Sequence, residues 1–333
     1  MNRLFLLLYS LLLCVLFSCG AAGKSNETLK VHGQAVQVIE KTDSCKLDPK
    51  NTYEVFIPER NNTVEKLPLL VIIDSHGSGK FALDKFKPVA NQYPAILVAS
   101  NLVKNVFEGF EGSILILIED VRQKYPAGET VFMTGFSGGA RIALGYGMAH
   151  QISGLILCGA LANAEQIHAL RCPVISISGM DDFNFMETAQ YLFQEQLIPV
   201  NLKIELTNAS HNWPDSMMLT DAFGFLCLSC QAADIPSQTK SQLALYSQHQ
   251  HARTNSLKKQ GDYLKAALVA RNMSSTAPFN NDKTFASAYC ELKASSEYIN
   301  EMNRLKNSLD LEISKRQTYL GAFMTKDSVW WKN

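Results

Sequence analysis

Apolar and polar positions alternate in blocks along roughly the first two thirds of the chain. Continuous apolar runs of strand length are followed by stretches in which apolar residues recur at helical spacing. The clearest run, at 67–74, has the unbroken apolar character of a parallel strand that is buried on both faces. Strands that alternate regularly with helices predict a mostly parallel sheet with right-handed crossovers.

The same pattern places the remaining elements. We expect strands at 34–40, 53–58, 67–74, 95–99, 130–134, 154–158, 172–178 and 201–206. We expect helices at 81–89, 113–125, 139–150, 164–170, 185–195 and 215–230. The first two strands can pair as an antiparallel edge. The prediction is an α/β domain at 51–232, with a sheet of about eight strands flanked by helices.

The pattern changes at a loop that contains Pro236, and residues 233–333 read as an all-helical C-terminal region. We expect helices at 240–259, 262–273 and 285–319. Gly261 to Ala266, followed by Pro278, is weakly similar to half of one tetratricopeptide repeat, which cannot bury its own face. These helices should therefore dock on the α/β domain or bind a protein partner. Trp330-Trp331 either pins the terminus or stacks on a sugar.

Composition excludes some partners. Lys plus Arg and Asp plus Glu both number 31 among 333 residues, and no basic block carries interleaved aromatic residues. We therefore expect no nucleic-acid partner. With 47% apolar residues, the chain can build a sizeable core.

The N-terminus carries a targeting signal. Asn2-Arg3 is followed by an apolar run at 4–17, which is too short to span a membrane comfortably. Small residues around Cys19 resemble a bacterial lipoprotein cleavage site. We expect a signal peptide at 1–18, lipidation of Cys19, and a tether and edge strand at 19–50. That predicts anchoring to a bacterial membrane in the cell envelope, periplasmic or surface-exposed; the alternative is a secretory signal cut near Ala21 or Ala22.

Export would place the six cysteines that follow Cys19 in an oxidising compartment, where disulfides can persist. Their pairing cannot be read from the sequence. Cys158 and Cys172 lie in apolar strand-like runs and are predicted to be buried thiols. Cys227 and Cys230 lie in a helical run without a second Cys/His pair at zinc spacing, which favours core packing. We predict neither a metal nor a cofactor.

The chemistry centres on Gly135-Phe136-Ser137-Gly138-Gly139, between a predicted strand and a predicted helix. This is the pattern of a nucleophile elbow, in which a serine occupies a sharp strand-to-helix turn. Gly135 and Gly139 would allow strand and helix to approach, and the helix start would direct N–H groups at a reacting carbonyl.

A nucleophilic serine also needs a base and an acid. His211 follows the last predicted strand, whereas His249 and His251 lie in a polar helical stretch and read as solvated. Asp181 and Asp182 follow the preceding strand, with Glu165 as the next candidate acid.

A second oxyanion donor is expected in the turn after the third strand. That turn, His76-Gly77-Ser78-Gly79, would supply an N–H group from Gly77 or Ser78 beside the Gly138 N–H.

Residues 53–58, 76–79, 135–139, 179–184 and 211–214 together resemble the α/β-hydrolase superfamily. Within it they are most similar to secreted esterases of the polyhydroxybutyrate-depolymerase and feruloyl-esterase type. The resemblance covers about residues 51–230 and implies a serine esterase that forms an acyl-enzyme without a cofactor, on a small-molecule or polymeric ester. It also implies that the acid is Asp182, immediately before Phe183-Asn184. The alternatives are a peptidase on the same fold and a catalytically inert binding lipoprotein.

Overall fold

The computed structural model describes residues 38–59, 66–230 and 240–325, which belong to one compact unit. The predictions for Cys19, for the signal peptide and for Trp330-Trp331 lie outside these residues. None of the helices in the described ranges combines the length and apolar composition that crossing a membrane requires.

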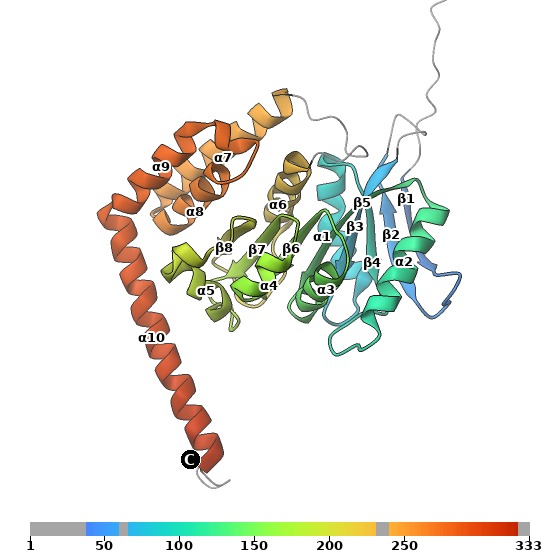
Figure 1. The fold of residues 1–333 in the computed structure, drawn as a ribbon, viewed down its shortest axis with the longest axis horizontal. Helices are drawn as coiled ribbons and strands as arrows, with labels where there is room; N and C mark the ends of the chain where they lie inside the picture. Colours follow the sequence, from blue (N-terminus) through green and yellow to red (C-terminus); the bar gives the residue numbers. More distant parts are fainter. Residues whose placement is uncertain (1–37, 60–65, 231–239, 326–333) are drawn as a thin grey trace, which may run out of the picture. The chain divides into compact units, whose positions relative to one another are not determined.

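The described residues form one sheet of eight strands in the order β1-β2-β4-β3-β5-β6-β7-β8 (Figure 1). The strands are β1 (Ile39–Ser44), β2 (Thr52–Ile57), β3 (Leu67–Ile73), β4 (Ile96–Ser100), β5 (Ala127–Phe136), β6 (Gly154–Cys158), β7 (Val174–Gly179) and β8 (Leu202–Thr207). The pairs β1–β2 and β2–β4 are antiparallel, and the other neighbouring pairs are parallel. The predicted α/β-hydrolase fold is confirmed.

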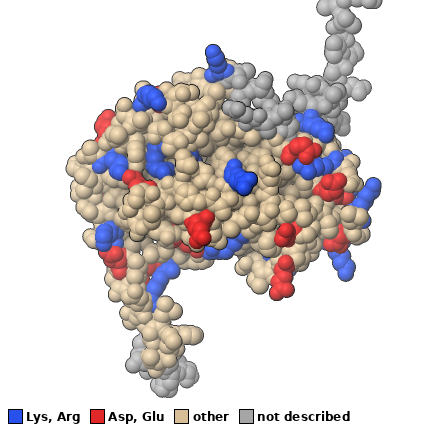
Figure 2. All heavy atoms as spheres, in the orientation of Figure 1, with Lys and Arg blue, Asp and Glu red and all other residues tan. Residues whose placement is uncertain are grey.

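Ten α-helices lie in the described ranges. They are α1 (Gly79–Gln92), α2 (Phe110–Lys124), α3 (Gly138–Ala149), α4 (Ala164–Ala169), α5 (Met186–Phe193), α6 (Ser216–Ser229), α7 (Lys240–Gln260), α8 (Tyr263–Ser274), α9 (Lys283–Ala294) and α10 (Ser296–Thr325). On the face shown in Figure 2, charged side chains of both signs are interspersed over the surface.

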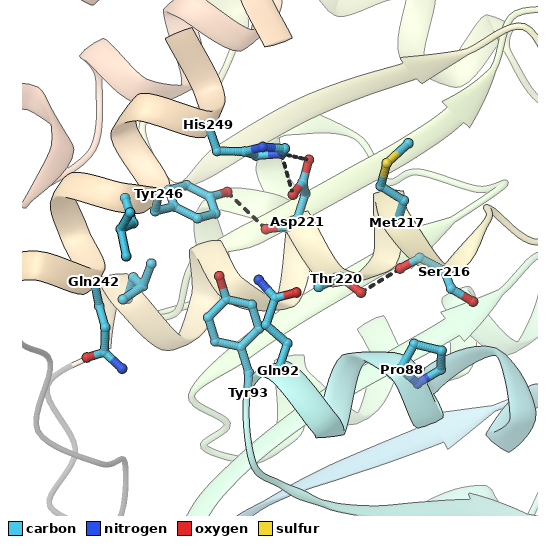
Figure 3. A pocket seen from close by; sticks show the side chains of 12 residues that line it. Pro88, Gln92, Tyr93, Ser216, Met217, Thr220, Asp221, Gln242, Tyr246 and His249 are labelled. Atoms are coloured by element: carbon cyan, nitrogen blue, oxygen red, sulfur yellow. Dashed lines mark hydrogen bonds and ion pairs between the residues drawn. The ribbon is translucent and has the colours of Figure 1, made fainter. Parts of the chain in front are cut away.

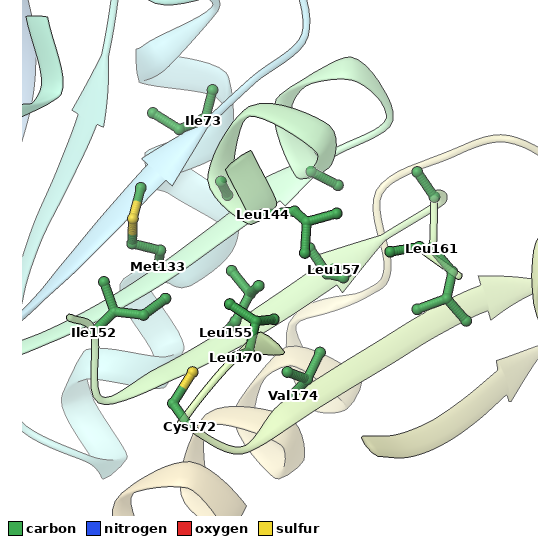
Figure 4. Close-up of a cluster of buried hydrophobic side chains, with 14 of the residues drawn as sticks. Ile73, Met133, Leu144, Ile152, Leu155, Leu157, Leu161, Leu170, Cys172 and Val174 are labelled. Carbon is green, nitrogen blue, oxygen red and sulfur yellow. The ribbon is translucent and has the colours of Figure 1, made fainter. Parts of the chain in front are cut away.

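The central strands are buried on both faces, because an apolar layer of side chains covers each side of the sheet. On one face α1 and α6 contribute Phe86 and Phe223. On the other, Met133 and Leu155 of the strands meet Leu144 of α3, in the layer that also receives α2, α4 and α5 (Figure 4). This packing holds the carboxyl ends of β3, β5, β7 and β8 at one edge, where loops carry function in α/β sheets.

The C-terminal helices cover the outer edge of β8. The side-chain amide of Asn272 in α8 donates to the carbonyl O of Ile204 (2.9 Å) and accepts from its N–H (3.3 Å). Arg253 of α7 forms an ion pair with Glu205 of the same strand, at 2.6 Å. Asn272 thus takes the place of a further strand on an edge that would otherwise expose unpaired backbone groups.

Most elements lie within a few residues of the predicted ranges, and two of them show the differences that matter most. The first strand is Ile39–Ser44 rather than 34–40, and the expected helix at 285–319 is two helices, α9 and α10. The break lies at Ser295, which has extended backbone angles (φ −74°, ψ 147°) and whose Oγ accepts from the N–H of Tyr298 at 3.2 Å. Serine is favoured at such a cap, and apolar periodicity that continues across it hides the break.

Candidate active site

Ser137 lies at the turn between β5 and α3, with φ 54° and ψ −117°. A positive φ is uncommon for a residue other than glycine and persists only where the surroundings enforce it. Here the close approach of strand and helix enforces it. A Cβ on Gly135 would lie 2.3 Å from the backbone of Gly139, and a Cβ on Gly139 would lie 2.1 Å from the carbonyl O of Ile73. Both glycines therefore have the role that the sequence predicts.

Three predicted side chains meet at this turn. Ser137 Oγ lies 2.9 Å from His211 Nε2, and His211 Nδ1 lies 2.8 Å from Asp182 Oδ2 and 2.9 Å from Oδ1. A carboxylate only accepts hydrogen bonds, so this geometry suits the tautomer with the proton on Nδ1, in which Nε2 can accept from the serine hydroxyl. Asp182 lies in the loop after β7, His211 in the loop after β8, and Ser137 in the turn after β5.

The loops around Asp182 and His211 hold both side chains in place. The Asn184 N–H donates to Asp182 Oδ1 at 2.7 Å, and only 2% of the Asp182 side chain is exposed. The His211 ring is tilted against the rings of Phe136 and Phe183, whose centroids lie 4.7 and 4.2 Å away. The carboxylate and both rings therefore fix the orientation of the imidazole. Asp181, by contrast, is exposed.

The three residues predicted as oxyanion donors differ in the hydrogen bonds that their N–H groups make. Gly138 is the first residue of α3, so its N–H lacks an acceptor within the helix and lies at the positive end of the helix dipole. The N–H groups of Gly77 and Ser78, however, donate to Asp74, at its carbonyl O (3.1 Å) and its Oδ1 (3.3 Å). Both groups thus bond within the turn after β3, and their role as oxyanion donors stays a prediction.

Asp74 is a residue that sequence reasoning missed. It is 3% exposed, and its Oδ2 accepts from Trp213 Nε1 at 2.9 Å. It therefore links the turn after β3 to the loop that carries His211. A carboxylate at the end of an otherwise apolar run was the available signal.

A cavity of about 470 Å³ opens beside Ser137 and His211. Phe81 and Lys85 of α1 contribute to its wall, together with Asn105 from the loop after β4. The Lys85 Nζ lies 4.9 Å from the centroid of the Phe81 ring. The volume is within the usual range for small-molecule sites.

A larger cavity, of about 670 Å³, lies between α1, α6 and α7 (Figure 3). It contains His249, which forms a pair with Asp221 at 3.1 Å, while His251 forms one with Asp282 at 2.8 Å. Neither histidine reaches the serine, and Glu165 is exposed at the start of α4. The size of a cavity is thus a poor guide to the reactive centre in this molecule.

The predicted burial of Cys158 and Cys172 is confirmed. Burial raises the pKa of the Cys172 thiol to about 12 and that of Cys158 further. Cys227 packs in the apolar layer beneath α6. Within the described ranges, no three side chains of the metal-ligating types gather in one place.

No protein-family model and no curated protein matches the sequence. Among solved structures, FphF, a fluorophosphonate-binding serine hydrolase of Staphylococcus aureus, is 13% identical over 58% of this chain and 99% of that chain, with a TM-score of 0.48. S-formylglutathione hydrolase from the same species is 14% identical over 56% and 92%, with a TM-score of 0.44. A Pyrobaculum calidifontis esterase is 11% identical over 53% and 77%, with a TM-score of 0.41. Likenesses this distant do not assign an activity.

Proposed function

We propose that this chain is a serine hydrolase, and specifically a carboxylic-ester hydrolase that works through an acyl-enzyme. The observation that carries the proposal is the continuous hydrogen-bonded chain from Asp182 through His211 to Ser137. It starts at a buried carboxylate and ends at a serine on a strained turn beside a cavity. A nucleophile, its base and the group that orients the base are the minimum set for acyl transfer.

The chemistry follows from this geometry. As Ser137 Oγ attacks the ester carbonyl, its proton passes to His211 Nε2, and Asp182 stabilises the resulting imidazolium. The Gly138 N–H stabilises the oxyanion of the tetrahedral intermediate. His211 returns the proton to the departing alcohol, which leaves an acyl group on Ser137. Water attacks this acyl group while His211 accepts its proton, and protonation of Ser137 then releases the acid.

We further propose that the enzyme works in the cell envelope, anchored through a lipid on Cys19. The support is the sequence alone: a positive start, a short apolar run and small residues around the cysteine. The substrate would then be a small-molecule or polymeric ester that meets the enzyme outside the cytoplasm.

Labelling with a fluorophosphonate probe tests the proposal. Wild type should be labelled and should hydrolyse aryl esters faster than peptides, whereas Ser137→Ala should lose labelling and roughly a millionfold in turnover. Ser153→Ala is the matched control, because Ser153 precedes β6 at the opposite end of the sheet. When cells are fractionated, the fluorophosphonate-labelled protein should be found in the membrane fraction for wild type and in the soluble fraction for Cys19→Ala.

Other outcomes would favour the alternatives. Faster cleavage of peptides than of esters would indicate a peptidase. A folded wild type that the probe does not label would indicate an inert binding protein. A Cys19→Ala variant that stays wholly in the membrane fraction would overturn the lipid anchor.

A further inference from the structure

Val106, in the loop between β4 and α2, has a φ of 61°. In the described ranges, Ser137 is the one other non-glycine residue with a positive φ. For a β-branched side chain such a φ is a genuine outlier that costs folding free energy. The side chain of Val106 regains little of this cost by burial, because the residue is 88% exposed.

The surrounding loop imposes this conformation on Val106. The Asn105 N–H donates to the carbonyl O of Ser75 at 2.9 Å, and Asn105 Oδ1 accepts from the Val106 N–H at 3.1 Å. Val103 on one side is fully buried, and Phe107 on the other packs against the core. Both flanks are thus fixed, and the valine between them is held outward.

The loop lies at the reactive serine. Asn105 lines the cavity that contains Ser137. Its carboxamide lies so close to Gly138 that a Cβ there would come within 2.5 Å of Asn105 Cγ. Val106 is therefore one residue away along the chain from the wall of this cavity.

Two further exposed apolar side chains lie at or next to the same cavity. Phe81 of α1 lines the cavity and is 54% exposed. Phe183 is 60% exposed, and its ring centroid lies 4.2 Å from that of His211, which lines the same cavity. With Val106 they give three exposed apolar residues, from separate segments of the chain, that line the cavity or directly neighbour a residue that lines it. Exposed apolar surface gathered in this way usually marks a binding site.

We propose that Val106, together with Phe81 and Phe183, binds an apolar group of the ester substrate, so that the enzyme prefers esters with a medium-length alkyl chain to short ones. This inference rests on the proposed esterase activity at the same site. Contact with an alkyl chain removes the exposed valine from water, and transfer of apolar surface out of water favours binding. The chain belongs to the acyl or the alcohol part of the ester, and the experiment distinguishes these sources.

The test measures kcat/KM for a long and a short ester of the same kind, and compares the long-to-short ratio between variants. One arm uses p-nitrophenyl octanoate and acetate, and the other uses octyl and ethyl acetate. Wild type should prefer the longer ester by at least about tenfold in one arm, which also identifies the part that is bound.

Val106→Asn should lower the long-to-short ratio of the preferred arm about fivefold, because contact with the alkyl group would then remove less apolar surface from water. It should also raise Tm by about 2 °C, since asparagine tolerates a positive φ better than valine does. Val106→Thr keeps β-branching and its strain, so it should lower the ratio without raising Tm. Val200→Asn makes the same change at a valine that is 77% exposed in the segment before β8, and should leave the ratio unchanged.

The outcomes separate two kinds of failure. A wild type that hydrolyses none of the four esters would overturn the proposed function, and the inference with it. A wild type that hydrolyses long and short esters equally well would overturn only the inference. So would a Val106→Asn or Val106→Thr variant with the wild-type ratio.

Discussion

Two adjacent aspartates at the end of β7 have opposite surroundings. Asp182, taken as a whole residue, is 6% exposed and its carboxylate is bonded to His211, whereas Asp181 is exposed. β7 ends at Gly179, and in the turn that follows it Asp182 is the residue whose carboxylate contacts the imidazole. The environment of each carboxylate, rather than its position in the sequence, decides its role.

This contrast gives a prediction for the two aspartates. Asp182→Asn should lower turnover by on the order of ten-thousandfold, because an amide favours the wrong tautomer of His211 and stabilises the imidazolium less well. Asp181→Asn serves as the matched control and should be nearly silent. Steady-state kinetics and a thermal melt of each variant decide the matter. If the two variants trade places, the acid is misassigned by one residue.

Sequence reasoning reached Ser137, His211 and Asp182 because chain order and strand ends constrain where such side chains can meet. It did not identify Asn105 or Val106. The positive φ of Val106 depends on tertiary contacts of the residues on both sides of it, which the pattern of apolar and polar positions does not show. The hydrogen bonds from Gly77 and Ser78 to Asp74 could not be predicted either. The direction of a backbone N–H depends on the turn and on the nearby carboxylate of Asp74.

At the scale of elements, the apolar pattern located most strands and helices to within a few residues. Continuous apolar runs reveal strands buried on both faces, such as β3 and β6. The same pattern could not show what covers β8, because Asn272 does so from a polar position in α8. Side-chain pairing with an edge strand follows from tertiary packing and not from periodicity.

Asn272→Leu should therefore destabilise the protein by about 2–4 kcal/mol, since both backbone groups of Ile204 would lose their partner in a buried place. Leucine has a similar size, so little of the loss would come from packing. The exposed Asn307 of α10 offers the matched control, and Asn307→Leu should change stability by less than about 0.5 kcal/mol. Denaturant unfolding measures both. Equal stabilities of the two variants would contradict the structural role given to Asn272.

At the scale of the whole molecule, the C-terminal helices share the two apolar layers of the sheet. Leu264 and Ala266 of α8 belong to the layer of α3, while Met273 and Phe285 belong to that of α1 and α6. α10 also contacts the loop after β7 that contains Asp182, where Arg316 donates to the carbonyl O of Phe183 at 2.9 Å. The described C-terminal helices are therefore packed against the core of the α/β domain.

A chain that ends at Asp234 should accordingly be poorly soluble or melt well below wild type. Its truncation would expose both apolar layers and leave the edge of β8 open to pairing with other chains. A chain that ends at Arg316 is the informative comparison. It keeps the bond to Phe183 and loses a segment in which Leu320 and Met324 are 65% and 86% exposed, so it should melt near wild type. Both are compared by thermal melting and ester kinetics. Wild-type behaviour of the shorter chain would show instead that the helices fold as an independent module, which would point to a protein partner for them.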